Sequence, residues 1–279
     1  MIVLVCLCNF QSYILDNIDN LLRFNNDITV IIDNEFIPLL NKYTNIKIIS
    51  VESLLDDYNN IKSSLKSTFR NGFWQLTSLR FTILYQYMKI YDIKNIIHIE
   101  NDVLVFKNLD NFIFHDTSKI LLTLDCFNRC IPGIMFIPNS DILNMCITSF
   151  DSNMNDMQNW ANSYKKFPEQ LDTLPIFINT DTDTTELSLI TKNFKHYNSI
   201  FDAAAIGQFL GGIDPRNSNV VDTVGFINET CIIDYSKYKF DWVKDDNYDA
   251  YKPCIIIDNN KYDVINLHIH SKNLKKFIF

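Results

Sequence analysis

The sequence predicts an α/β protein in which helices flank a single doubly wound sheet of mixed, mostly parallel strands. Short apolar runs rich in β-branched residues have the length and composition of buried strands, at residues 2–8, 28–32, 46–49 and 96–99. Between these runs, apolar residues recur at the spacing of an amphipathic helix. Strands that alternate with helices build parallel sheets, so this order favours the doubly wound class.

The first half of the chain gives the clearest alternation. Apolar residues at helical spacing between residues 14 and 22 predict a helix, and the strand after it ends in Asp33-Asn34. Residues 73–91 form the longest expected helix. Gly72 is the first glycine of the chain, so no glycine-rich phosphate loop can follow the first strand. This absence argues against a dinucleotide dehydrogenase and against a P-loop kinase.

The second half is less regular. Two strands and a helix are expected first, at residues 120–125, 133–137 and 141–150. Residues 151–200 are only weakly periodic and predict no defined element. Asp202 then has the position of an N-cap for a helix that ends at Gly211-Gly212, in which small residues would allow close packing.

Size and composition predict one folded domain. The chain has 279 residues, 47% of them hydrophobic and 21% charged, with a formal net charge of −8. A nucleic-acid partner would need a basic surface, which this charge argues against. No apolar run approaches the roughly 18 residues of a membrane span. The seven cysteines lack zinc-site spacing and are expected to be core thiols in a reducing compartment. We therefore expect a cytoplasmic protein, and its richness in Asn, Ile, Lys and Asp suggests an AT-rich genome, as in a protist or large virus.

An acidic turn interrupts the apolar stretch of residues 96–106. Glu100 and Asp102 directly follow the expected strand, at the end of a parallel strand where open α/β sheets bind their ligands. Paired carboxylates are the usual ligands of Mg²⁺ or Mn²⁺, and a cation bound there could also hold a diphosphate. The alternative is a solvated turn, because Asn and Asp favour turns for local reasons.

Arg80 lies inside the apolar stripe of the expected helix 73–91, four residues from both Leu76 and Leu84. A guanidinium in that position needs an anion, which the acidic turn or a bound phosphate could supply. Otherwise the side chain would reach the helix edge and solvent.

Residues 264–272 near the C-terminus alternate between apolar and polar side chains. His268, His270 and Lys272 would therefore share one face of a regular strand. Two imidazoles and an ammonium group make a poor core but suit a metal ion and a phosphate.

These features together resemble the metal-dependent glycosyltransferases of the GT-A fold, which use a nucleotide-sugar donor. By resemblance, Glu100-Asn101-Asp102 corresponds to the acidic DxD motif of the family, with Glu100 facing the donor ribose or the metal and Asp102 ligating the metal. Arg80 looks like the basic residue that these enzymes place near the donor. Ile131-Pro132-Gly133 stands where the family often has Asn-Ala-Gly.

The C-terminus resembles the HxGxxKPW motif of the glycogenin-like branch of that family. His270 and Lys275 match the motif spacing, and Phe277 stands in place of its tryptophan. Lys272 replaces the glycine of the motif. His268 is a competing metal ligand, so the metal set implied by the resemblance is Glu100, Asp102 and either or both histidines.

The resemblance implies transfer of a sugar from a nucleotide-diphosphate sugar, with UDP as the expected nucleotide, to a glycan, protein or lipid acceptor in the presence of Mn²⁺ or Mg²⁺. Residues 1–125 would form the nucleotide-binding half of a single domain. Residues 126–279 would bind the acceptor and supply the metal- and phosphate-binding C-terminal segment. Arg80, Lys272 and Lys275 would stabilise the leaving diphosphate.

Three side chains are candidates for catalysis. Asp202 would be the base if the reaction inverts, and Asp202 or Gln208 could lie beneath the anomeric carbon if it retains. Asp125, at another strand end, is the alternative. Competing hypotheses are a sugar nucleotidyltransferase and a non-catalytic nucleotide-sugar-binding module. The aromatic region around Trp160, Tyr164 and Trp242 would either belong to the core or stack on an acceptor sugar.

Overall fold

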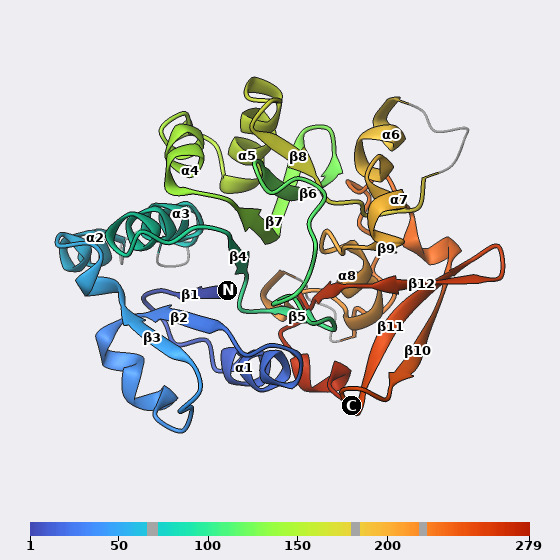
Figure 1. The fold of residues 1–279 in the computed structure, drawn as a ribbon, viewed down its shortest axis with the longest axis horizontal. Helices are drawn as coiled ribbons and strands as arrows, with labels where there is room; N and C mark the ends of the chain where they lie inside the picture. The colour runs from blue at the N-terminus through green and yellow to red at the C-terminus, as the bar shows by residue number, and fades with distance from the viewer. Residues whose placement is uncertain (66–71, 180–184, 218–221) are drawn as a thin grey trace.

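A seven-stranded sheet organises the computed structural model, which describes residues 1–65, 72–179, 185–217 and 222–279 (Figure 1). The strand order is β3-β2-β1-β4-β7-β6-β8. Its strands are β1 (Ile2–Cys6), β2 (Ile28–Ile32), β3 (Lys47–Ser50), β4 (Ile96–Ile99), β6 (Ile120–Cys126), β7 (Arg129–Ile137) and β8 (Leu171–Thr173). Only β7 runs antiparallel to its neighbours in this sheet. The predicted class, a mixed and mostly parallel α/β sheet, is confirmed.

Helices cover both faces of this sheet. Val3 and Val5 of β1 pack with α2 (Tyr58–Leu65), α3 (Phe73–Ile90), α4 (Ser140–Ile147) and α5 (Asp156–Lys166). Ile2 and Leu4 point the other way and pack with α1 (Tyr13–Phe24). Successive residues of a strand face opposite sides, which is why one continuous apolar run supplies two cores.

Two smaller sheets, which the sequence did not predict, complete the fold. A four-stranded sheet has the order β10-β11-β12-β9, and β13 pairs with β5 in a two-stranded sheet. These strands are β9 (Ser199–Ile200), β10 (Lys239–Asp245), β11 (Ala250–Ile257), β12 (Asn260–Val264), β5 (Val103–Val105) and β13 (Asn266–His268). The remaining helices are α6 (Thr185–Thr191), α7 (Phe194–Tyr197) and α8 (Ala205–Gly211), with short 3₁₀ turns η1 (Asn34–Leu40), η2 (Val51–Ser53), η4 (Pro215–Asn217), η5 (Tyr235–Lys237) and η6 (Leu274–Phe277).

The strand expected at residues 264–272 is shorter than predicted. Strand pairing in β13 ends at His268, and the chain then turns, with Lys272 at a positive φ of 65°. The alternation of side chains therefore does not continue beyond His268. His268, His270 and Lys272 do not share one strand face.

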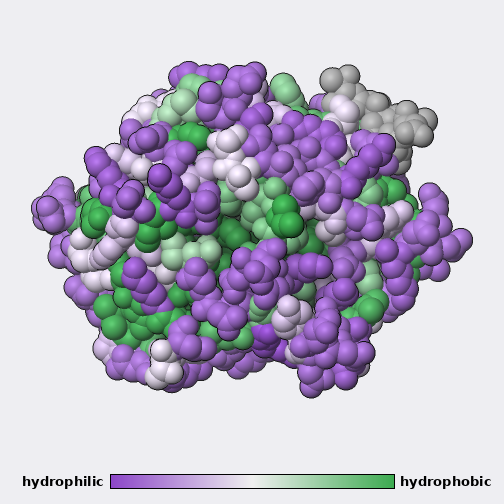
Figure 2. Space-filling view, in the orientation of Figure 1, coloured by the Kyte–Doolittle hydropathy of each residue, from purple (hydrophilic) through white to green (hydrophobic). Residues whose placement is uncertain are grey.

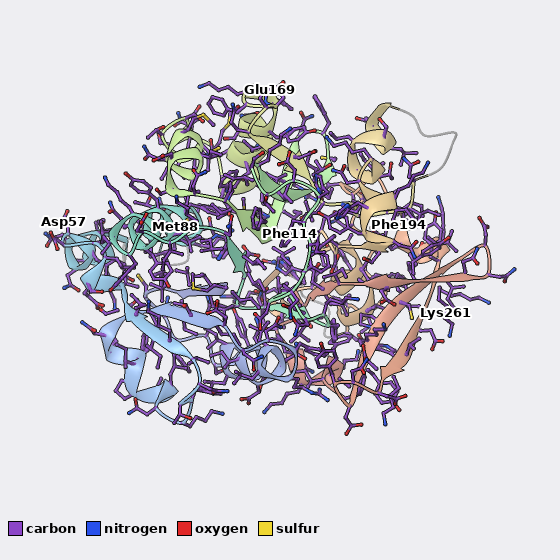
Figure 3. The ribbon with its side chains drawn as sticks, viewed as in Figure 1. Asp57, Met88, Phe114, Glu169, Phe194 and Lys261 are labelled. Carbon is purple, nitrogen blue, oxygen red and sulfur yellow. The ribbon has the colours of Figure 1, made fainter. Side chains whose placement is uncertain are left out.

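Side chains sort between interior and surface as the apolar pattern predicts. Met88, Phe114 and Phe194 are buried between the layers, whereas Asp57 and Glu169 project from the periphery (Figure 3). The face shown in Figure 2 is mostly hydrophilic, with apolar residues gathered at its lower left, over the end of the sheet that contains β2 and β3. Among the described helices, none is both long enough and apolar enough to cross a membrane.

Of the aromatic residues considered as an acceptor platform, Trp160 belongs to the core, and Tyr164 and Trp242 are half-buried against it. Trp160 is fully buried, with its ring centroid 5.0 Å from that of Phe81 and 5.4 Å from that of Phe150. Trp242 packs edge-on against Phe106, at 5.8 Å between centroids. Of the two alternatives that the sequence left open, these contacts support core packing.

Candidate active site

The acidic turn and the C-terminal histidine meet at the end of β4. After Ile99 the chain passes through Glu100 and Asp102 into β5, and β13 runs antiparallel to β5 with His268 opposite Val103. The Nε2 atom of His268 lies 3.3 Å from a carboxylate oxygen of Glu100 and 3.2 Å from one of Asp102. Strand pairing thus brings His268 next to two carboxylates that are distant from it in the sequence.

Amide side chains fix the shape of this turn. Asn101 points back into the sheet, where its Nδ2 donates to the carbonyl of Val5 (2.9 Å) and to Oε1 of Gln11 (2.7 Å). Asn17 of α1 donates to the carbonyl of Asn101 (3.1 Å). The central residue of the motif is therefore structural, while Glu100 and Asp102 face the other side. Sequence reasoning missed Asn17; the available signal was its position three residues after Ile14 and four before Leu21, on the apolar face of the expected helix.

Two cations pair with the two carboxylates. Arg80 of α3 forms an ion pair with Glu100 and a second one with Asp156, at 2.9 Å. Lys272 forms an ion pair with Asp102. The predicted need of Arg80 for an anion is thus met twice. Asp156, at the first position of α5 behind the capping residue Asn155, was not predicted as part of the site.

These pairings determine the charge state of the cluster. Burial alone would raise the pKa of Glu100, but Arg80 and His268 outweigh it and hold the pKa below its usual value. Burial opposes the ionisation of Asp102 in the same way, yet Lys272 and His268 hold its pKa well below the usual value. Both side chains are therefore carboxylates at neutral pH. In turn, the two carboxylates outweigh burial and raise the pKa of His268.

The donor atoms fit a divalent cation. One ligand atom each from Glu100, Asp102 and His268 lies within 4.8 Å of the others. Two carboxylate oxygens and an imidazole nitrogen are a donor set that Mn²⁺ accepts readily, and oxygen ligands suit Mg²⁺. The Nε2 atom of His268 already faces the carboxylates, so the ring has the orientation that a metal ligand requires.

His270 and Lys275, which matched the resembled motif, lie apart from these three groups. The Nδ1 atom of His270 accepts a hydrogen bond from the backbone N–H of Asp214 at 2.9 Å. Burial, with some help from Lys272, lowers the pKa of His270 to about 4. The Lys275 side chain is 80% exposed and its Nζ lies 3.7 Å from a carboxylate oxygen of Asp16. Because the chain turns after His268, the side chains of His270 and Lys275 point away from the cluster of Glu100, Asp102 and His268.

Asp202 connects β13 and α8 through hydrogen bonds to the backbone of both elements. Its carboxylate accepts hydrogen bonds from the backbone N–H groups of Ile206 (2.9 Å), Gly207 (2.8 Å) and His268 (2.9 Å). The side chain is buried and binds N–H groups in the first turn of α8, but the N-cap position is Ala204 and not Asp202 as the sequence predicted, because the helix begins only at Ala205. Gly207 permits this approach, because a Cβ there would lie 2.1 Å from the carbonyl oxygen of His268.

The other two catalytic candidates differ in access to solvent. Asp125 is fully buried, and its carboxylate accepts from Nε of Arg129 at 3.0 and 2.8 Å. Gln208 in α8 is half-buried and lines the cleft described below, while its Oε1 is buried and has no hydrogen-bond partner among the described residues. Of the three catalytic candidates, Gln208 is the one that lines the cleft.

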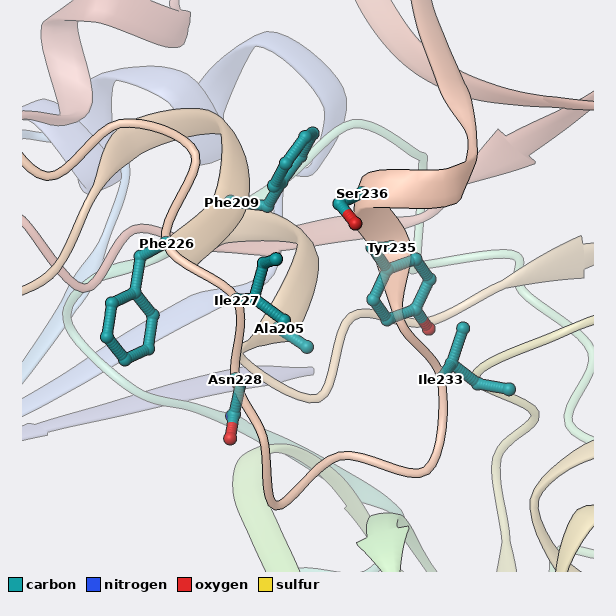
Figure 4. A pocket seen from close by; sticks show the side chains of 8 residues that line it. All are labelled: Ala205, Phe209, Phe226, Ile227, Asn228, Ile233, Tyr235 and Ser236. Carbon is teal, nitrogen blue, oxygen red and sulfur yellow. The ribbon is translucent and has the colours of Figure 1, made fainter.

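A cleft of about 1170 Å³ opens where β1 and β4 end. Its walls are the loop between β1 and α1, the first turns of α3, residues 214–217 and the C-terminal turn, and Glu100, Asp102 and His268 lie within it. A second, smaller hollow lies between α8 and residues 226–236, lined by Phe209, Phe226 and Tyr235 among others (Figure 4). That hollow has no room for a water-sized molecule, so we place the candidate active site in the large cleft.

The sequence matches no protein-family model and no curated protein. Among solved structures, the fold is similar to the apo form of mouse xyloside xylosyltransferase 1, with 12% identity, a TM-score of 0.41 and coverage of 62% of this chain and 84% of that one. It is also similar to the galactosyltransferase LgtC in complex with donor and acceptor sugar analogues, with 14% identity, a TM-score of 0.42 and coverage of 62% and 73%. The glycosyltransferase GlyE of Streptococcus pneumoniae shows 13% identity, a TM-score of 0.41 and coverage of 62% and 45%. Likeness at this level assigns neither an activity nor a ligand to this chain.

Proposed function

We propose that this chain is a glycosyltransferase that moves a sugar from a nucleotide-diphosphate sugar, with UDP as the nucleotide, to a hydroxyl acceptor with the help of Mn²⁺ or Mg²⁺. The observation that carries the proposal is the convergence of Glu100, Asp102 and His268 at the end of a central strand, inside the large cleft. Ligands of open α/β sheets bind at this edge. The resemblance of the acidic turn to a DxD motif supports the same site.

In this proposal Glu100, Asp102 and His268 hold the cation, which supplies positive charge to the leaving diphosphate when bound. Lys272 and Arg80 already carry positive charge at the two carboxylates and would stabilise the departing phosphates. His270 and Lys275 would act from the neighbouring turn rather than from the cluster. Residues 1–125 would hold mainly the nucleotide and residues 126–279 the acceptor, within one domain.

We assign Gln208 to the reacting sugar. It lines the cleft, and its buried Oε1 has no partner among the described residues, so a rotation of the carboxamide toward the cleft would let it contact a bound sugar. Asp202 accepts three backbone hydrogen bonds and would act through the position of His268 and α8. Asp125 would act through Arg129, which also lines the cleft.

The decisive experiment is product analysis with a panel of nucleotide-sugars, with and without Mn²⁺. We expect release of a free nucleoside diphosphate that depends on Mn²⁺, and loss of that release in Asp102→Asn, which keeps the size of the side chain but removes its charge. Asp246→Asn is the matched control, because the Asp246 side chain is 91% exposed on a distant strand end.

Two results would contradict the proposal. Release of pyrophosphate from a nucleoside triphosphate and a sugar phosphate would identify a nucleotidyltransferase. Tight binding of a nucleotide-sugar without turnover, across a broad set of acceptors, would identify a binding module. Unchanged activity in Asp102→Asn would remove the site assignment alone.

A further inference from the structure

Two large aromatic side chains are exposed at the cleft. Phe73 and Trp74 form the first turn of α3, line the cleft and remain 37% and 41% exposed. Their rings contact each other edge to face, with centroids 4.9 Å apart and planes at 74°. Aromatic residues carry most of the apolar area that proteins bury, so an exposed pair inside a cleft is the kind of surface that ligands cover.

Phe73 lies on the same helix face as Arg80, the cation that contacts the acidic turn, and Trp74 follows Phe73 directly in the chain. Phe73, Thr77 and Arg80 follow one another at the i, i+4, i+7 spacing of one face, and all three line the cleft. Trp74 precedes Arg80 by six residues, which is roughly 9 Å along the helix axis. A molecule covering Trp74 would therefore lie next to the group bound at Glu100, not on top of it.

The cleft is large enough for such a second molecule. Its volume of about 1170 Å³ exceeds the range of about 300–1,000 Å³ that is usual for a single small-molecule site. The cleft wall is also rich in carboxamide side chains, which both donate and accept hydrogen bonds. These are Asn9, Gln11, Gln208, Asn217 and Asn228.

Amide groups beside flat aromatic rings suit a carbohydrate. The C–H faces of a sugar ring pack on an aromatic ring, while its hydroxyl groups need donors and acceptors around the edge. A lipid chain would instead need a continuous apolar channel, and this cleft alternates apolar with amide and charged groups. Among the chain's three tryptophans, Trp160 is fully buried and Trp242 is half-buried outside the described lining of the cleft, so Trp74 is the one available to such a ligand.

We propose that Phe73 and Trp74 form the platform on which a sugar ring of a carbohydrate acceptor stacks. The inference rests on the proposed glycosyl transfer and adds the acceptor class to it. In this arrangement the donor occupies the end of the cleft at Glu100, Asp102 and His268. The acceptor enters along the first two turns of α3, and its hydroxyl group reaches the donor near Gln208.

The test measures carbohydrate binding separately from transfer. Wild-type protein with Mn²⁺ and UDP is applied to an array of neutral and acidic oligosaccharides, and each bound oligosaccharide is then titrated in solution while tryptophan emission is followed. We expect a saturable change in emission, because Trp74 is the tryptophan that lines the cleft. We expect Trp74→Ala and Phe73→Ala to weaken binding by about tenfold, and Trp74→Phe, which keeps a stacking ring, to weaken it less.

Kinetics give the second readout. In both alanine variants the KM for the acceptor should rise by about tenfold, while the KM for the donor and the release of nucleoside diphosphate to water stay unchanged. Tyr91→Ala is the matched control, because Tyr91 is an equally exposed aromatic (44%) at the other end of α3 and outside the described lining of the cleft.

The failures of the two proposals are distinguishable. Oligosaccharide binding that depends on Trp74, without any transfer, would contradict the transferase proposal but support Phe73 and Trp74 as a carbohydrate-binding platform. Transfer whose acceptor KM is unaffected in Trp74→Ala would remove the platform and leave the transferase. Absence of any bound oligosaccharide on the array would also overturn the platform, and would direct the search for an acceptor to proteins.

Discussion

Arg80 of α3 connects the acidic turn to α5 through two ion pairs. Its guanidinium contacts Glu100 on one side and Asp156 of α5 on the other, and its exposed fraction is only 8%. Burial raises the pKa of Asp156, and Arg80 opposes that rise. If one of the two carboxylates were removed, the buried guanidinium would either move or interact more strongly with the remaining carboxylate. Asp156 is therefore a positioning residue for Glu100.

We expect Asp156→Asn to lower the apparent affinity for Mn²⁺ by about 10- to 100-fold, the range seen when a group behind a metal ligand is changed. The physical reason is that Arg80 would then neutralise Glu100 more completely. Isothermal titration with Mn²⁺ measures the effect. Asp151→Asn is the control, since Asp151 is exposed in the loop before α5. Equal affinities in both variants would show that Asp156 only stabilises its helix.

His98 gives a pH prediction at the same scale. Its Nδ1 donates to the carbonyl of Val3 at 3.1 Å within the sheet, and burial together with Arg80 lowers its pKa to about 3. In the unfolded chain the imidazole takes up a proton near pH 6.5. Between these values the unfolded state binds more protons, so the free energy of unfolding falls as pH falls, by up to about 1.4 kcal/mol per pH unit.

His98→Gln removes the imidazole that takes up a proton on unfolding, while the amide of Gln can still donate a hydrogen bond to the carbonyl of Val3. Urea denaturation at several pH values between about 3 and 6.5 should therefore give a shallower decline of the free energy of unfolding in the variant than in the wild type. Parallel declines would mean that the folded protein protonates His98 as readily as the unfolded chain does.

At the scale of elements, two glycines decide how closely β13 approaches its neighbours. A Cβ at Gly133 of β7 would lie 2.9 Å from Nδ1 of His268, which is a side chain that can move. A Cβ at Gly207 of α8 would lie 2.1 Å from the backbone carbonyl of the same residue. The first contact bears on the orientation of the imidazole, and the second on the packing of a helix against a strand.

We expect Gly133→Ala to displace the imidazole and weaken Mn²⁺ binding, at a cost to folding of about 1–3 kcal/mol. Gly207→Ala should lower the free energy of unfolding more than Gly133→Ala does, because backbone has to move. Urea denaturation of both variants, with Mn²⁺ titration of Gly133→Ala, tests the pair. The distinction between the two glycines fails if Gly207→Ala is the more stable variant.

At the scale of the molecule, protection from solvent is uneven. Every residue of β1 and β4 is buried, and these two strands pair at the centre of the large sheet. β10 lies at the edge of the four-stranded sheet, with β11 as its partner there. Lys239, Asp241 and Lys244 place charges along this edge, which discourages pairing with another chain.

Amide hydrogen exchange should reproduce this gradient. We expect residues 96–99 to exchange only through global unfolding, and residues 239–245 to exchange through local opening, which has a lower free energy. Peptide-level mass spectrometry under native conditions measures both. Equal protection of the two segments would show that the smaller sheet unfolds together with the large one.

The sequence by itself determined the class of the fold and the place of the acidic turn. Both follow from local patterns, because apolar runs of strand length, helical spacing between them and two carboxylates after a strand are properties of neighbouring residues. The contact of Asp202 with the start of α8 was also expected, although the N-cap itself is Ala204. Residues 151–200 gave no clear pattern, because apart from the 11-residue α5 their described elements have seven residues or fewer, which is too short for a periodicity to show.

Only the tertiary structure decided which distant residues join the turn. His268 and His270 are equivalent by spacing, but strand pairing with β5 directs the first to Glu100 and Asp102, and a turn directs the second to Asp214. Lys272 reaches Asp102 while Lys275 points to solvent, and Asp156 meets Arg80 across two helices. Such contacts depend on how elements that are far apart in the chain pack together. A pattern among neighbouring residues carries no information about that packing.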